Sequence, residues 1–389
     1  MPTLRILHLA HVINKNDFID TIVRYLPRDR FKMEVATFQA TSNIADPAYE
    51  KEGIPHHILP VPHPRAYYAY LRAAYQLSHL LRKREIHILH THHYWEGIVG
   101  ALVKKLRPSV RLVVHRHYTE DITRLRYLQR KIMLSLEKWT YCQSDAIVVP
   151  TQTISDFMQK THNKYFPNIH IIPYGFNLHD EKYKPLSPEE RAIIRKKYEV
   201  SENTLVIGNF ASHRHQKGQH LLLRAFARLH KEKPDTQLWL VGEGPETPLL
   251  RRMARELGLD EPPAAPPCRF LGWKKAAEVR QLLGATDIVA HPTFSEAFPQ
   301  LMVEALALER ALIITSVSGV KEWLTSGEHA LIISIGQEEA LFHALYTLSE
   351  NTHLRTKLGT QGRAHALAHF EYPIINPRYE SLYTALCSQ

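Results

Sequence analysis

Residues 204–229 have the sequence TLVIGNFASHRHQKGQHLLLRAFARL, and this stretch decides the fold class. It opens with a short apolar run, as in a strand buried on both faces, and closes with apolar residues at the spacing of one helix face. A basic turn joins the two parts. A strand followed by a helix in this way is one βα unit, so the stretch predicts a parallel sheet covered by helices.

The same alternation of short apolar runs and longer helical patterns occurs in both halves of the chain. The first series extends from LRILHLAHV at residues 4–12 to AIVVPT at residues 146–151, and the second extends from residue 204 to ALIISI at residues 330–335. Each series is long enough to bury its own hydrophobic core. We therefore predict an α/β protein with two doubly wound, Rossmann-like domains that face each other across a cleft.

Residues 179–203 interrupt the alternation. They are strongly charged and include Pro185 and Pro188, which is typical of a linker with a short helix. The predicted parts of the chain are an N-terminal domain at residues 1–178, a linker at 179–203, a C-terminal domain at 204–372, and a C-terminal helix at 373–389 that packs back on the N-terminal domain.

The composition is that of an ordinary soluble protein, with 44% hydrophobic and 23% charged residues in 389. The longest apolar runs are far shorter than the roughly 20 residues that cross a bilayer. The amino end carries Arg5, His8 and His11 and lacks a small-residue cleavage site, so we expect a buried strand there and a cytoplasmic protein. The three cysteines are scattered and are expected to be free thiols; they are Cys142, Cys268 and Cys387.

A formal net charge of +10 favours anionic partners. No nucleic-acid-binding module accompanies this charge, which argues against nucleic acid. The densest basic cluster, at residues 80–85, follows a segment at 66–77 in which Tyr67, Leu71, Ala74 and Leu77 have the spacing of one helix face. This segment either packs on a sheet as an ordinary helix or places a basic, aromatic face on an anionic membrane surface. The second account predicts a peripheral location at the inner face of the membrane.

The loops that follow the strands of the second half are where a ligand is expected, because open α/β sheets bind ligands beyond the carboxyl ends of their strands. Arg214 and Lys217 stand just before Gly218 and a helix, whose amino end favours phosphate, so they form a candidate diphosphate site or else a solvated basic loop. RFLGW at residues 269–273 ends a strand at Gly272, where a planar base could approach the backbone.

The loop at residues 295–305, SEAFPQLMVEA, places two carboxylates eight positions apart, on Glu296 and Glu304. If residues 297–308 are helical, the two lie about 12 Å apart along the helix axis. A sugar nucleotide could then place its phosphates on the amides near Phe298, its sugar hydroxyls on one carboxylate and its ribose on the other. The alternatives are a charge at the helix amino end and an exposed helix residue.

Together these motifs resemble the retaining glycosyltransferases of family 4, which have the two-domain architecture called GT-B. The resemblance extends over nearly the whole chain and is most specific at residues 208–320. The E-x7-E signature of the family matches Glu296 and Glu304, and its lysine-glycine element matches Lys217 and Gly218. Three further elements of the family also have matches in this chain. The glycine-rich turn matches VGEGPE at 241–246, the strand end that contacts the base matches FLGW at 270–273, and the aspartate-strand-proline element matches DIVAHPT from Asp287.

In the first half, the family's active-site histidine aligns best with His117, and His115 is the nearby competitor. Two departures from the family pattern concern phosphate and acceptor contacts. Asn14, Lys15 and Asn16 replace the usual glycine pair of the first loop, and Asn209 replaces an arginine of the second domain. Arg214 could supply that missing charge.

The resemblance implies transfer of a sugar from a UDP- or GDP-sugar to an acceptor hydroxyl on a saccharide or glycolipid, with retention of configuration, in cell-surface polysaccharide or glycolipid synthesis. It implies an acceptor-side N-terminal domain and a nucleotide-sugar-binding C-terminal domain. The chain contains no D-x-D pair, so we expect neither a metal nor a cofactor besides the nucleotide-sugar co-substrate. The implied catalytic residues are His117 and Glu296, and the implied donor-binding residues are Arg214, Lys217, Gly272, Phe298 and Glu304.

Two alternatives stay open. A sugar-nucleotide epimerase of the same architecture needs catalytic carboxylates in the first domain that have no obvious counterpart here. A catalytically silent GT-B subunit would bind a partner or a carbohydrate, and the intact Lys217, Glu296, Glu304 and His117 argue against it. Detection of sugar transfer, rather than of an epimer with free nucleotide, would separate these cases.

Overall fold

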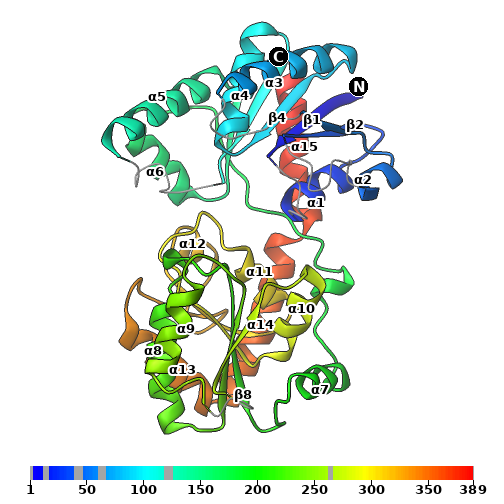
Figure 1. Cartoon of the computed structure of the whole chain (residues 1–389). Helices are drawn as coiled ribbons and strands as arrows, with labels where there is room; N and C mark the ends of the chain where they lie inside the picture. Colours follow the sequence, from blue (N-terminus) through cyan, green and yellow to red (C-terminus); the bar gives the residue numbers. More distant parts are fainter. Residues whose placement is uncertain are drawn as a thin grey trace. The chain divides into compact units, whose positions relative to one another are not determined.

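The computed structural model describes residues 3–11, 17–38, 47–59, 67–117, 126–261 and 266–388. The chain forms two compact units, which are described separately below (Figure 1). Unit 1 consists of Met1–Phe176 and Tyr372–Gln389, and unit 2 consists of Asn177–Glu371. The first-loop residues 14–16 and most of the proline-rich segment 262–267 lie outside the described residues.

Unit 1 contains a seven-stranded sheet, within the part of the chain that is described, in the order β3-β2-β1-β4-β5-β6-β7. All its pairings are parallel. The strands are β1 (Leu4–Ala10), β2 (Phe31–Thr37), β3 (His56–Ile58), β4 (Ile88–His92), β5 (Arg111–His115), β6 (Ala146–Val149) and β7 (Ile169–Ile171). The helices are α1 (Asp17–Tyr25), α2 (Pro47–Lys51), α3 (Tyr67–Lys83), α4 (Tyr94–Leu106), α5 (Tyr127–Gln143), α6 (Gln152–His162) and α15 (Tyr372–Ser388).

The last helix of the chain, α15, packs in unit 1 against α1 and the central strands (Figure 1). The rings of Tyr25 and Tyr372 stack with centroids 4.3 Å apart, and the Asn376 amide donates to the carbonyl of Thr21 at 3.1 Å. Further along α15, the Tyr383 hydroxyl lies 2.7 Å from Nδ1 of His90 on β4. The carboxyl end of the chain therefore completes the core of unit 1.

Unit 2 contains a six-stranded sheet over its described residues, in the order β10-β9-β8-β11-β12-β13, again with parallel pairing. The helices α8, α9 and α13 cover one face, and α10, α11 and α14 cover the other (Figure 1). The strands are β8 (Leu205–Phe210), β9 (Thr236–Val241), β10 (Cys268–Gly272), β11 (Ile288–His291), β12 (Ala311–Thr315) and β13 (Leu331–Ile333). The helices are α7 (Pro188–Lys197), α8 (Gln219–Glu232), α9 (Thr247–Glu256), α10 (Ala276–Ala285), α11 (Gln300–Ala307), α12 (Val320–Trp323), α13 (Glu338–Glu350) and α14 (Thr352–Phe370).

The prediction of two doubly wound domains, each with a parallel sheet, is thus confirmed. Residues 179–203, expected as a linker, belong to unit 2 and contain the short helices η2 (Glu181–Tyr183) and α7. Ser187 and Glu190 form a capping box at the start of α7. The chain crosses between the units at Phe176–Asn177 and at Glu371–Tyr372 instead.

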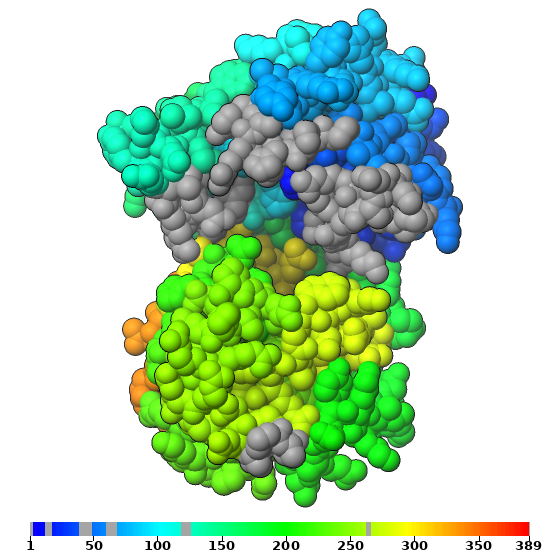
Figure 2. Space-filling model, viewed as in Figure 1, coloured from blue at the N-terminus to red at the C-terminus, as the bar shows by residue number. Residues whose placement is uncertain are grey.

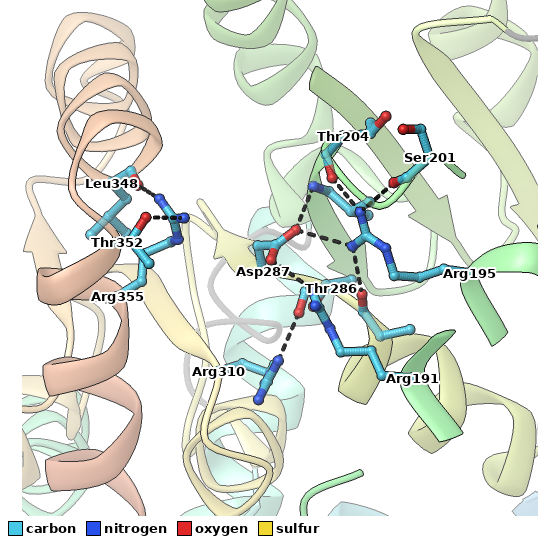
Figure 3. A network of polar contacts seen from close by, with 12 residues as sticks. Arg191, Arg195, Ser201, Thr204, Thr286, Asp287, Arg310, Leu348, Thr352 and Arg355 are labelled. Atoms are coloured by element: carbon cyan, nitrogen blue, oxygen red, sulfur yellow. Dashed lines mark hydrogen bonds and ion pairs between the residues drawn. The ribbon is translucent and has the colours of Figure 1, made fainter. Parts of the chain in front are cut away.

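A network of ion pairs around Asp287 attaches α7 to the sheet of unit 2 (Figure 3). The Asp287 carboxylate accepts hydrogen bonds from Arg191 at 2.6 Å, from the buried Arg195 at 3.3 Å and from the backbone N–H of Val206 at 2.8 Å. Arg195 also donates to the carbonyls of Ser201 and Thr204. Because these contacts join α7, β8 and the start of β11, the aspartate of the DIVAHPT motif has a structural role here.

The helix predicted at residues 66–77 is α3, but its buried face differs from the predicted one. Ala74 and Leu77 are buried as expected, whereas Leu71 is 60% exposed. The buried stripe includes Tyr70, Ala74, Leu77 and Leu81, and Leu71 lies about 100° around the helix from Tyr70, which points it outward. In the space-filling view, the light-blue residues of this part of the chain lie at the surface of unit 1 (Figure 2).

Two further expectations concern the state of the cysteines and the presence of membrane-spanning helices. Cys142 and Cys387 are exposed and Cys268 is buried, and all three, which lie in described segments, are free thiols. Among the described residues, no helix combines the length and the apolar character that a membrane crossing requires.

We predict that Asp287→Ala lowers the free energy of unfolding by about 3 kcal/mol, because it leaves the buried Arg195 guanidinium without its counter-charge. Denaturant unfolding followed by circular dichroism measures this loss. Glu339→Ala is the matched control, since it breaks the ion pair with Arg228 on the exposed face of α13 and should change stability little. Equal losses in the two variants would show that the Asp287 network does not anchor α7.

Candidate functional site

Lys217 and Glu296 form an ion pair at the carboxyl ends of two neighbouring strands of unit 2. Lys217 ends the short helix η3 (His215–Lys217), which follows β8, and Glu296 lies in the loop between β11 and α11. The strands β8 and β11 are hydrogen-bonded neighbours in the sheet, so the loops that follow them meet at the same edge. Each side chain keeps 17% of its surface exposed, which leaves the pair accessible to a ligand.

The two loops are held together by their backbones. The N–H of Phe294 donates to the carbonyl of Gln216 at 2.7 Å, and the Thr293 hydroxyl donates to the same carbonyl at 3.0 Å. Gly218 has a φ of +70°, and a Cβ atom at this position would lie 2.0 Å from the carbonyl oxygen of Pro292. Only glycine allows this close approach, which brings Lys217 beside the loop of Glu296.

The carboxylate of Glu296 is held by two groups that both contact its Oε1 atom. These are the ammonium group of Lys217 and Nε2 of His291, which lies at 3.1 Å. Burial by itself would raise the pKa of Glu296, but the hydrogen bond and charge of His291 and the charge of Lys217 outweigh it and lower the pKa to about 2. Glu296 is therefore an anion at neutral pH, and the hydrogen bonds that it receives from described residues all end on Oε1 rather than on Oε2.

The remaining predicted donor-binding residues lie on elements of the same unit. Arg214 is exposed and immediately precedes η3, and Gly272 ends β10 with a φ of +70°. Glu304 is half-buried in α11. Phe298 is buried, with its ring edge-on to that of Phe370 at a centroid distance of 5.6 Å, so its side chain serves packing.

The helix expected at residues 297–308 begins later, at Gln300. Pro299 stands at the N-cap, and a proline disfavours the helical conformation of the residue before it, here Phe298. Glu296 consequently lies in the loop, four positions before the helix, and the expected separation along one helix axis does not apply. His291, which lies within the DIVAHPT motif and hydrogen-bonds to Glu296, is a site residue that the sequence motifs do not predict.

In unit 1, His117 follows β5 and is the partly exposed end of a chain of hydrogen bonds. Its Nδ1 lies 2.7 Å from the Tyr174 hydroxyl, and its Nε2 lies 3.0 Å from Nδ1 of His92. Burial, together with the neighbouring His115, His93 and His90, lowers the pKa of His117 well below its usual value, so the ring is neutral at pH 7. The competing candidate, His115, is completely buried.

Sequence reasoning missed that His117 belongs to a cluster of histidines on one face of the sheet. His8 on β1 pairs in register with His90 on β4, and His92 on β4 pairs with His115 on β5. The motifs HTH at 90–92 and HRH at 115–117 contain the signal, because residues two positions apart point to the same face of a strand. We call His8, His90, His92, His115 and His117 the histidine cluster.

Two sequence families match the chain. Residues 17–180 match Glycosyltransferase Family 4, and residues 190–365 match Glycosyl transferases group 1. The chain is a GT-B glycosyltransferase. The first match lies almost entirely in unit 1 and the second lies in unit 2, so the two compact units correspond to the two domains of this class.

Similar proteins act on several acceptors. The glycosyltransferase is 24% identical over 318 residues to N-acetyl-alpha-D-glucosaminyl L-malate synthase of Bacillus anthracis, covering 80% of this chain and 78% of that one. It is 25% identical over 308 residues to D-inositol 3-phosphate glycosyltransferase of Corynebacterium glutamicum, and this match covers 76% of this chain and 71% of that one. The crystal structure of HepE from Anabaena in complex with UDP-glucose superposes with a TM-score of 0.81 and 22% identity, covering 98% and 100% of the two chains, which supports the fold.

We predict that Gly218→Ala destabilises the glycosyltransferase more than Gly258→Ala does. Both glycines have a left-handed backbone, with φ of +70° and +68°, which costs an alanine about 1–2 kcal/mol. At Gly258 a Cβ atom meets nothing within 4 Å, whereas at Gly218 it collides with the backbone of Pro292. Thermal unfolding of the two variants measures the difference. Equal destabilisation would mean that the loops of Lys217 and Glu296 separate at little cost.

Proposed function

We propose that this glycosyltransferase moves a sugar from a UDP- or GDP-sugar to a hydroxyl of a saccharide or glycolipid acceptor, with retention of the anomeric configuration. The observation that carries the proposal is the pair of Lys217 and Glu296, which places an ammonium beside a carboxylate with one oxygen atom left for a ligand. The names of the relatives support nucleotide sugars as donors and place such enzymes in the glycosylation of small polar and cell-surface acceptors.

Lys217 can bind the diphosphate of the donor while it keeps its contact with Glu296. An ammonium group has three N–H donors, and Oε1 of Glu296 occupies one of them. Departure of the nucleotide places negative charge on its terminal phosphate, and a cation already in position stabilises that charge without reorganisation. The exposed Arg214, three residues earlier, supplies a second cation. These charges replace the metal ion that a D-x-D pair would hold.

Glu296 acts on the sugar that is transferred. Its Oε2 atom accepts a hydrogen bond from a sugar hydroxyl, while Oε1 stays bound to Lys217 and His291. The sugar ring becomes positively charged as its bond to phosphate breaks, and a carboxylate whose pKa is about 2 remains an anion throughout. Glu296 therefore stabilises the transition state more than the bound donor. Glu304 holds the ribose hydroxyls, and Gly272 leaves room for the base.

His117 is the second catalytic residue, as the family resemblance implies. Its neutral imidazole can exchange the contact between Nε2 and His92 for a substrate hydroxyl group, while the contact between Nδ1 and the Tyr174 hydroxyl keeps the ring in one orientation. A glycolipid acceptor also gives a role to the exposed face of α3, where Tyr68, Leu71 and Tyr75 would lie on an anionic membrane surface.

A panel of nucleotide sugars tests the proposed function. A donor that binds only the folded protein raises its melting temperature by mass action, so thermal stabilisation identifies the donor. That donor is then incubated with saccharide and glycolipid acceptors, and NMR of the product gives the anomeric configuration. An epimerised donor without a glycosylated acceptor would instead support an epimerase.

We predict different kinetic effects for the two glutamates. Glu296→Gln should lower the maximal rate more than the donor affinity, since its contact strengthens in the transition state. Glu304→Gln should mainly raise the apparent KM for the donor, by roughly tenfold to a hundredfold, as expected for the loss of a hydrogen bond to a charged group. Donor-saturation kinetics measure both effects, with the exposed Glu256→Gln as the control. The same pattern in both variants would contradict the separate roles.

We also predict that nucleoside diphosphate binding depends on Lys217 and needs no divalent metal. Calorimetric titration of chelator-treated protein with UDP and GDP should give the same affinity with and without magnesium. Lys217→Met should weaken binding about tenfold or more, because it removes a charged donor and exposes the phosphates to Glu296. Lys231→Met, on the exposed end of α8, removes the same charge elsewhere in the unit and should have little effect. Binding that appears only with magnesium would exclude this phosphate site.

A further inference from the structure

Three members of the histidine cluster have the geometry of a metal site. One nitrogen atom from each of His92, His115 and His117 lies within 4.8 Å of the other two. His92 and His117 approach to 3.0 Å, and the rings of His115 and His117 stack with centroids 3.9 Å apart. Two nitrogen ligands of a tetrahedral zinc ion stand about 3.3 Å apart, which follows from Zn–N bonds of about 2.0–2.1 Å. Small side-chain rotations would therefore bring all three nitrogens onto one ion.

His115 is the member that most needs a ligand. Its side chain is completely buried, and neither of its ring nitrogens has a hydrogen-bond partner among the described residues. A buried polar group without a partner costs free energy, and such groups in native proteins usually have a partner, an ion or a functional reason. A metal ion bound to His115 would remove this cost.

We propose that His92, His115 and His117 bind a divalent transition-metal ion, with zinc as the first candidate. Imidazole nitrogen is a preferred ligand of zinc, copper and nickel, and three protein ligands leave a fourth position for water. All three ligands belong to unit 1.

The neighbours of the site would orient its ligands. With the ion on Nδ1 of His92, the Nε2–H of that ring donates to Nδ1 of His8, which lies 3.0 Å away. With the ion on Nε2 of His117, the Nδ1–H of that ring donates to the Tyr174 hydroxyl at 2.7 Å. Hydrogen bonds of this kind select the tautomer and the ring orientation in established metal sites.

A second trio in the cluster, formed by His8, His90 and His92, is the less suitable site. All three of its members are completely buried, whereas His117 is partly exposed and gives an ion a way in. His90 thus provides a control histidine from the same cluster.

An ion at this site would occupy Nε2 of His117. On the proposed function, in which His117 acts in catalysis, the ion therefore inhibits transfer rather than supports it. Direct binding measurements do not depend on that function, so failure of the two ideas can be distinguished.

The test uses the full chain without a histidine tag, after removal of metals with a chelator. Titration with zinc in competition with a chromophoric chelator gives stoichiometry and affinity, and cobalt substitution gives the visible absorption of a tetrahedral site. We expect one equivalent of zinc to bind and to raise the melting temperature. We expect His115→Phe to weaken binding at least about tenfold, and His90→Phe and the exposed His353→Gln to retain it.

Melting curves without metal show whether each variant folds. His115→Phe should fold, because it replaces an unpaired buried ring with an apolar one of similar size. Zinc binding that survives in folded His115→Phe, or that is lost in His90→Phe but not in His115→Phe, would overturn the assignment. The absence of stoichiometric zinc binding by the wild-type protein would overturn the site altogether.

Discussion

Parallel pairing of neighbouring strands is the constraint on which both units depend. A sheet whose two faces are covered by helices can expose polar side chains only where its strands end, and parallel strands end at the same edge. The pairing of β8 with β11 brings Lys217 to Glu296, although 79 positions separate them in the chain. Without this pairing, the cation and the carboxylate would be unrelated surface charges.

The proposed function explains the pair of Lys217 and Glu296 better than a contribution to stability does. Removing two charges from water costs about as much as their attraction returns, so a partly buried ion pair contributes little to folding by itself. Here both Lys217 and His291 contact one oxygen atom of the Glu296 carboxylate. Gly218, which allows this approach, has a left-handed backbone conformation that an alanine would adopt only at a cost in free energy. This arrangement holds an anion and a cation in place before any substrate binds, as the role that we propose for them in glycosyl transfer requires.

Unit 1 uses the same constraint for a different set of side chains. The strands β1, β4 and β5 carry imidazoles on one face where aliphatic residues would ordinarily pack, and α15 contributes Tyr383 to that layer from the end of the chain. The buried rings are neutral, which makes such a layer compatible with a core. The imidazole nitrogens also give this core groups that can exchange protons or bind a metal ion, which an aliphatic layer would lack.

The sequence by itself determined the alternation of strands and helices, and with it the two parallel sheets, because local periodicity reports which faces are buried. It also identified Lys217, Gly218 and Glu296, since the first two stand in a basic turn between a strand and a helix and the third matches the E-x7-E signature. Only the tertiary structure decided which of these residues touch, where the helix after Pro299 begins, that residues 179–203 belong to unit 2, and that five distant histidines share one face. Which residues touch depends on strand order and register, which arise from contacts between residues far apart in the chain. Local signals such as the HTH and HRH spacings show which residues share a face of one strand but do not show which strands are neighbours.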